Sequence, residues 1–110
     1  MAERWTITDD LDVLFPGHRS SERAIEWEAL KSRYPSDRIV RGTVVMKSVF
    51  GAWIDLGVGF PALLQIVAIE GLTREKYAAG DWCPLGSEVT ATFFGFDEYK
   101  RQLGLRQRVV

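Results

Sequence analysis

The hydrophobic positions along the chain change their spacing at Pro35. Before this proline, Ser20 and Ser21 offer an N-cap, and Glu22 lies in the first turn that would follow them. The next apolar side chains recur at helical spacing, at Ala24, Trp27, Leu30 and Tyr34. The pattern predicts an amphipathic helix of about three turns, an ordinary length in globular proteins, which Pro35 ends.

Beyond Pro35 the chain consists of short β-branched and aromatic runs separated by glycine. These runs predict five strands, at Ile39–Lys47, Ala52–Leu56, Pro61–Ile66, Glu88–Phe96 and Gln102–Leu105. Single glycines at the expected bends and bulges favour a small closed barrel over an open sheet. The connection from Val67 to Gly86 is too long for a hairpin, and a helical turn is expected near residues 73–79.

The first nineteen residues are mixed and acidic. Asp9, Asp10 and Asp12 lie close together in the sequence, and the Pro16-Gly17 pair indicates a turn. We expect this segment to be an arm that lies on the domain. The sequence therefore divides into residues 1–36, an arm and amphipathic helix that pack on the barrel, and residues 37–110, the barrel itself.

Composition and charge narrow the function classes. At 110 residues the chain fits one domain with one core. Its 14 basic and 15 acidic residues give a net charge of −1, which argues against nucleic-acid binding driven by overall charge alone. A local site stays possible, because proteins that bind single strands also use aromatic platforms. A single cysteine and the lack of a long apolar run near the start predict a cytoplasmic protein without a membrane span.

Candidate chemistry is sparse. His18 is the only histidine, so few residues are available to form a histidine metal site or a histidine-based nucleophile relay. The aspartates of the arm lack the further ligands and the glycine of a calcium loop. Cys83 has no neighbouring histidine or basic residue in the sequence to activate it, so a structural thiol is expected. The sequence predicts no catalytic residues, no metal and no cofactor, and the protein is not expected to be an enzyme.

A family resemblance begins at residues 42–57, GTVVMKSVFGAWIDLG. This stretch resembles the first hairpin of the ribosomal protein S-one type RNA-binding domain. The resemblance continues through ALLQ at 62–65, LGSEVTATFFGFD at 85–97 and QLGLRQ at 102–107, and it covers about two thirds of the chain. It implies a mainly β fold, a five-stranded Greek-key oligonucleotide-binding barrel, here preceded by an α-helix.

The resemblance also implies binding residues. Phe50 and Trp53 match the family's two stacking aromatics, Gln65 lies where a base-contacting histidine is common, and Asp97 matches the acidic residue at the end of the fourth strand. The basic residue that follows in the family is either Lys100 or Arg101. Lys47 adds a further phosphate contact, although the family often has an aliphatic residue there. Gln65 can hydrogen-bond a base, but it cannot stack or carry charge as histidine can.

Alternation along the second strand offers two placements for Trp53. Ala52 and Ile54 share one face, whereas Trp53 and Asp55 share the other. If the aliphatic face is the core, Trp53 faces solvent, where it could stack on a base together with Phe50. The alternative is that both rings pack against the N-terminal arm or helix, whose own aromatic residues need partners.

Two functions follow from these observations. The first is a non-catalytic module that binds single-stranded RNA by stacking on Phe50 and Trp53, a role compatible with association with the ribosome or an RNA-processing enzyme. The second is a protein-interaction module that docks a partner or a second copy on the same aromatic face. RNA binding predicts that Lys47, Lys100 and Arg101 converge near Trp53, and protein docking predicts a neutral or acidic rim at Asp55, Asp97 and Glu98. The oligomeric state stays open.

Overall fold

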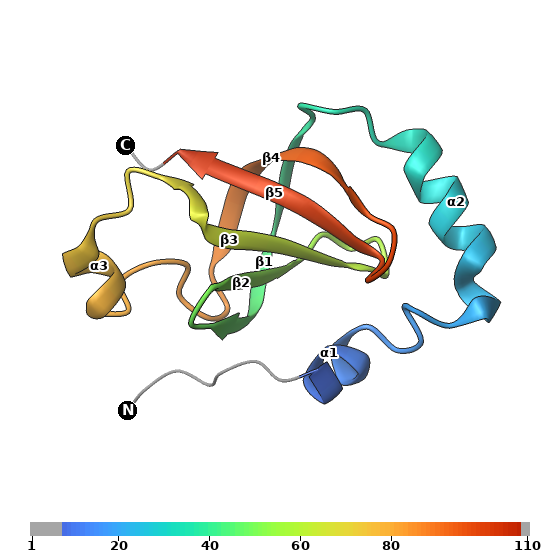
Figure 1. Ribbon diagram of the computed structural model, residues 1–110, viewed down its shortest axis with the longest axis horizontal. Helices are drawn as coiled ribbons and strands as arrows, with labels where there is room; N and C mark the ends of the chain where they lie inside the picture. Colours follow the sequence, from blue (N-terminus) through green and yellow to red (C-terminus); the bar gives the residue numbers. More distant parts are fainter. Residues whose placement is uncertain (1–7, 109–110) are drawn as a thin grey trace.

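The computed structural model describes residues 8–108, and five strands in this range form a closed barrel in the order β1-β2-β3-β5-β4 (Figure 1). The strands are β1 Ile39–Ser48, β2 Gly51–Asp55, β3 Pro61–Glu70, β4 Glu88–Asp97 and β5 Gln102–Arg108. β3 and β5 pair in parallel, and the other neighbouring strands pair antiparallel. The predicted mainly β fold, a five-stranded oligonucleotide-binding barrel preceded in the sequence by an α-helix, is confirmed.

β1 closes the barrel because it pairs with a different strand along each of its halves. Its first half, Ile39–Thr43, pairs with β4, and Thr43–Ser48 pairs with β2. The register shifts between Val44 and Met46, where a bulge bends the strand. At Gly42 the β1 backbone lies very close to β2, since a Cβ atom there would lie 2.5 Å from the Asp55 carbonyl oxygen. Glycine is therefore required at this position by space.

The barrel interior is filled by the aliphatic and aromatic residues that alternate along the strands. Every strand contributes to it, through Val44, Ala52, Ile54, Ala62, Leu64, Phe93, Leu103 and Leu105, all of which are buried. The residues between them point outward. This alternation therefore determines which residues form the outer face of the barrel.

The predicted helix is present as a short 3₁₀ turn, Ser21–Arg23, followed by α2, Ala24–Arg33. The Ser20 hydroxyl accepts a hydrogen bond from the Glu22 amide at 3.0 Å, as expected of an N-cap. Trp27 and Leu30 are buried and join the barrel core. The Trp27 indole also donates to Glu98, which directly follows β4, at 3.0 Å. α2 is thus fixed to the barrel by packing and by a hydrogen bond.

Of the two further helices, one was not predicted from the sequence and the other corresponds to a predicted helical turn. The N-terminal arm contains a helix that the sequence did not predict, α1, Thr8–Leu14, while residues 1–7 of the arm lie outside the described residues. The predicted turn near 73–79 is α3, Arg74–Ala78, whose N-cap is Thr73. Figure 1 shows α2 and α3 on opposite sides of the barrel. Within residues 8–108, no helix is long and apolar enough to span a membrane.

β3 is longer than predicted, because its last residues pair with β5. Ile69 lies opposite Gln107, and Glu70 lies opposite Arg108, after an irregularity that follows Leu64. Ile69, in this added part of the strand, is buried in the barrel core. The division of the chain between residues 36 and 37 stays a prediction.

Replacing Gly42 tests the closure of the barrel. We expect Gly42→Ala to lower the free energy of unfolding by about 1–3 kcal/mol, because its Cβ would overlap the backbone and side chain of β2. Gly95→Ala is the matched control, since a Cβ there meets nothing within 4 Å. Urea unfolding of both variants measures the difference. Equal stability of the two variants would contradict this account of closure.

Candidate functional site

The outer face of β2, β3, β5 and β4 carries a row of neighbouring residues. Leu63 on β3 lies opposite Trp53 on β2 and opposite Gly104 on β5. The Phe94 ring of β4 lies over Gly104, where a Cβ atom would come within 2.7 Å of the ring. The row therefore crosses four strands without interruption, and glycine on β5 makes room for the aromatic ring.

A shallow pocket of about 250 Å³ opens on this face beside the Phe94 ring. It is lined by Leu63, Gln65, Phe94, Gly95, Phe96, Asp97, Gln102, Leu103, Gly104 and Leu105. Two of the predicted site residues, Gln65 and Asp97, are thus brought together by β3 and β4. They lie next to an aromatic side chain that is 50% exposed.

Phe94 was not among the predicted site residues, although the sequence contained a signal for it. Phe93 and Phe94 are consecutive in a predicted strand, so alternation places one inside and the other outside. Phe93 is buried in the core, and Phe94 points outward. The family pattern drew attention to the second strand instead, and for this reason the exposed ring of the fourth was missed.

Phe50 lies at the turn between β1 and β2 and is 46% exposed. It adjoins Gln65, because Gly51 pairs with Gln65 and the Phe50 carbonyl accepts a hydrogen bond from the Ile66 amide at 2.8 Å. Its ring meets Trp53 edge to face, with ring centroids 5.4 Å apart. Phe50 therefore provides a second accessible aromatic side chain beside Gln65.

Trp53 points to the outer face, as alternation predicts, but the expectation that it faces solvent is wrong. It is only 4% exposed, because Leu11 and Phe15 of the N-terminal segment pack with it, together with Met46. The alternative placement, against the arm, is observed for Trp53 but not for Phe50, which is 46% exposed. Within residues 8–108 the Trp53 indole nitrogen has no hydrogen-bond partner.

Lys47 does not lie where it could hold a phosphate, and this correction has a clear physical reason. The side chain is 2% exposed, and its Nζ donates to the carbonyl oxygen of Trp82 at 2.6 Å and to that of Gly80 at 3.4 Å. The ammonium group also lies 4.1 Å from the centroid of the Trp82 ring. Lys47 thus fixes the connection between β3 and β4 to the barrel.

The other predicted cations are divided between two roles. The Arg101 guanidinium donates to the carbonyl oxygen of Ser20 at 2.6 Å and to that of His18 at 3.5 Å, so it holds the N-terminal segment. The Lys100 side chain is exposed, and its backbone amide donates to Asp97 at 3.0 Å. The expected convergence of Lys47, Lys100 and Arg101 near Trp53 is therefore not observed.

The acidic residues expected at the rim also have local partners. Asp55 accepts a hydrogen bond from the Gly57 amide at 2.8 Å. Glu98 forms an ion pair with Lys31 at 2.8 Å, and this contact, followed by the Trp27 hydrogen bond, lowers the pKa of the Glu98 carboxyl below its ordinary value. Its charge is thus partly neutralised by α2. Neither sign of charge dominates the face.

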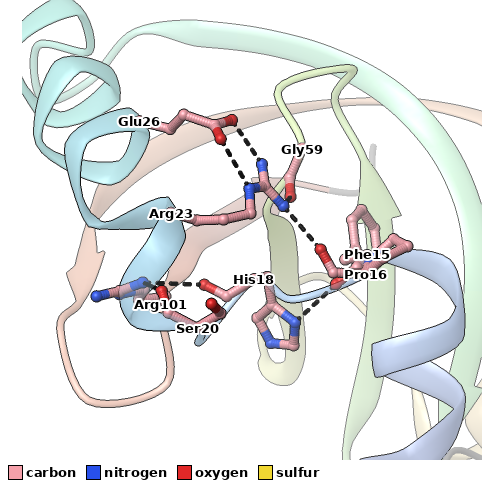
Figure 2. Close-up of polar contacts among 8 residues, drawn as sticks. All are labelled: Phe15, Pro16, His18, Ser20, Arg23, Glu26, Gly59 and Arg101. Carbon is pink, nitrogen blue, oxygen red and sulfur yellow. Dashed lines mark hydrogen bonds and ion pairs between the residues drawn. The ribbon is translucent and has the colours of Figure 1, made fainter.

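Two arginines hold the segment between α1 and α2 (Figure 2). Arg23 donates to the carbonyl oxygens of Pro16 at 3.0 Å and Gly59 at 3.2 Å, while Glu26 accepts two further bonds from the same guanidinium. Arg101 holds the same segment through the carbonyl oxygens of His18 and Ser20. We call residues 16–20, held in this way, the clamped segment.

His18 lies in the clamped segment with its side chain buried and its Nδ1 3.0 Å from the Phe15 carbonyl oxygen. Burial lowers the pKa of the imidazole below its ordinary value of about 6.5, and the Phe15 carbonyl and Asp12 oppose this effect only in part. The folded protein therefore binds this proton less tightly than the unfolded chain does.

This depressed pKa predicts a loss of stability in mild acid. As the pH falls through about 6.5, the unfolded chain takes up a proton that folded His18 resists, so the free energy of unfolding decreases. Urea unfolding at pH 7.5 and pH 5.5 measures the change. His18→Gln is expected to flatten this part of the pH profile, and an unchanged profile in that variant would assign the effect to other groups.

Lys47 gives a second test, because its contacts predict a role in stability. Lys47→Met removes the donor to Trp82, and we expect the free energy of unfolding to fall by about 1–3 kcal/mol. Lys76→Met, at an exposed lysine of α3, is the matched control and is expected to have little effect. If both variants are as stable as the parent protein in urea, the proposed fastening role of Lys47 is wrong.

Comparison with known sequences gives a partial match. No protein-family model matches the chain. A stretch of 79 residues, 72% of this chain, is 33% identical to 4-hydroxy-3-methylbut-2-enyl diphosphate reductase of Clostridium tetani. The chain spans only 12% of that protein's length. The reductase activity is therefore not carried over to this chain.

Several solved structures resemble the barrel. The alpha subunit of aIF2 from Pyrococcus abyssi is 26% identical, with a TM-score of 0.57 over 70% of this chain and 30% of that one. The a/eIF2alpha-aDim2p-rRNA complex from Pyrococcus horikoshii contains a chain that is 25% identical, with a TM-score of 0.56 over 69% of this chain and 46% of that one. GSP13 from Bacillus subtilis shares the fold at 19% identity, with a TM-score of 0.57 over 67% of this chain and 55% of that one.

Proposed function

We propose that this oligonucleotide-binding barrel of the ribosomal protein S-one type is a non-catalytic module that binds single-stranded RNA. The observation that carries the proposal is the pair of half-exposed rings, Phe50 and Phe94, near Gln65 and Asp97 on the outer face of the barrel. Unpaired bases can be splayed out and stacked on such rings, and each stack contributes about 1–3 kcal/mol.

Gln65 and Asp97 supply the polar groups of the proposed site. The Gln65 amide can both donate to and accept from a base edge, whereas the Asp97 carboxylate can accept from an exocyclic amine. Both line the pocket beside Phe94, so a base stacked on that ring would have its edge near them. This arrangement supports a shallow site with limited discrimination between bases.

The comparisons support RNA as the ligand class. One of the similar structures is a complex that contains rRNA, and its similar chain is 25% identical to this one. Cytoplasmic location and association with the ribosome or an RNA-processing enzyme belong to the same proposal. The proposal that bases stack on Phe50 and Phe94 rests on the side chains of this protein and not on those of the similar structures.

Phosphate neutralisation contributes little to binding in this proposal. Lys47 is buried against carbonyl oxygens and Arg101 holds the clamped segment, which leaves Lys100 as the exposed member of the predicted cation set. A single phosphate contact on a single strand gives a slope of about −0.7 in a plot of log affinity against log salt. Affinity is therefore expected to depend weakly on salt.

Titration of the protein with a short single-stranded RNA tests the stacking role. We expect Phe94→Ala and Phe50→Ala each to weaken binding by about 5- to 150-fold, which corresponds to one lost stack. Ile25→Ala removes an apolar side chain of α2 that is more exposed than either ring, and it is expected to leave binding unchanged. Fluorescence anisotropy of labelled RNA at two salt concentrations gives both the affinity and the salt slope.

Two results would contradict the proposal. One is the absence of binding to any single-stranded RNA at low salt by the folded protein. The other is equal weakening in Ile25→Ala and Phe94→Ala, which would indicate that the outer face has no special role.

A second candidate function is protein docking on the same face. The dispersion of Lys47, Lys100 and Arg101 favours it, because a docking face does not need convergent cations. An exposed aromatic side chain such as Phe94 is also a common centre of a protein interface. Failure of the RNA titration, combined with a Phe94-dependent complex with a purified protein partner, would establish this alternative.

A further inference from the structure

α1 covers the part of the outer face that holds the largest aromatic side chain, Trp53. We propose that α1 is an autoinhibitory cover, and that it must leave the barrel before Trp53 can join Phe50 in binding RNA. The inference rests on the proposed function of this face. It adds a closed state and an open state to that function.

The covered and open parts of the face are continuous. Trp53 is buried under Leu11 and Phe15, yet its ring touches Phe50, which is half exposed. Gln65 follows on the neighbouring strand, opposite Gly51. α1 therefore covers only part of the aromatic surface. Its departure would add the Trp53 indole to the rings that are already exposed.

The closed state leaves a polar group without a partner. Among the residues that the structure describes, the buried Trp53 Nε1 lacks a hydrogen-bond acceptor. A buried unsatisfied donor costs free energy that exposure to water or to a ligand would recover. An indole that serves only as core has a partner in most proteins, as Trp27 does here through Glu98. The unsatisfied donor thus favours opening.

The chain is built so that α1 can leave while the clamped segment stays. The described contacts of α1 and its following turn with the barrel are apolar, through Leu11 and Phe15. Residues 16–20 are instead held by the two arginines shown in Figure 2. Gly17, with a φ of 65°, is the second residue of the clamped segment, two residues after Phe15, and provides backbone freedom there. The arrangement separates an anchor from a cover.

Charge makes α1 and RNA compete. α1 has the sequence TDDLDVL, with three aspartates and no basic residue. A negatively charged helix on the edge of the site repels phosphates while it is closed, and it also occupies the space in which a base would stack on Trp53. RNA binding and closure are therefore mutually exclusive at this end of the face.

Loosening the cover in the full chain tests the inference. Leu11→Ala combined with Phe15→Ala truncates the two side chains of α1 and its following turn that pack in a cluster with Trp53, and Val13→Ala changes an exposed residue of α1. The probe is a labelled single-stranded RNA of about ten nucleotides, within the site size of one oligonucleotide-binding barrel. We expect the double variant to bind about fivefold or more tightly than the parent, because less free energy is spent on opening.

Further measurements separate a cover from a structural element. Adding Trp53→Ala to the double variant is expected to cancel the gain in affinity, and Val13→Ala is expected to bind as the parent does. Without RNA, the Trp53 indole N–H should exchange with water faster in the double variant, as followed by NMR. Circular dichroism checks folding, and Phe15→Leu replaces the double variant if that chain does not fold.

The outcomes distinguish the inference from the function on which it rests. If the parent protein binds RNA through Phe94 and the loosened variants bind no more tightly, α1 is a structural cover and only the inference is overturned. If no form binds RNA, the proposed function is wrong and the inference falls with it. A gain that survives Trp53→Ala would also overturn the inference, because the uncovered ring would not be its cause.

Discussion

The pairing of β1 with both β2 and β4 is the constraint on which the remaining structure depends. Because the barrel is closed, its interior accepts only the residues that alternate inward, and the residues between them must lie outside. Gly42 permits the closure by leaving space for the Asp55 carbonyl. The row that contains Trp53, Leu63 and Gly104 is a direct consequence of that register.

The N-terminal segment uses three different kinds of contact with this barrel. α2 buries Trp27 and Leu30 in the core and forms an ion pair with Glu98 through Lys31. The clamped segment is held through its carbonyl oxygens by Arg23 and Arg101. α1 adds apolar packing on the outer face. The kind of attachment thus changes from core burial and an ion pair at α2 to apolar packing at α1, and the proposed cover relies on this difference.

Much of the fold could be predicted from the sequence, because strand alternation, glycine bends and helix caps are local signals. The site was predicted less completely, since its accessibility depends on contacts between distant parts of the chain. Alternation gave the correct side for Trp53, but no local pattern revealed that Leu11 and Phe15 would cover it. Lys47 reaches carbonyl oxygens more than thirty residues away. Phe94 could have been found from alternation alone.

The central claim is that the outer face of β3, β5 and β4 is where RNA binds. NMR mapping of backbone amides during titration with a short single-stranded RNA tests it most directly. The account predicts that the amides of Gln65, Gly95 and Gly104, beside the Phe94 ring, shift most and together. Shifts confined to the β1 and β4 surface around Arg41 and Glu88, which form their own ion pair, would contradict it.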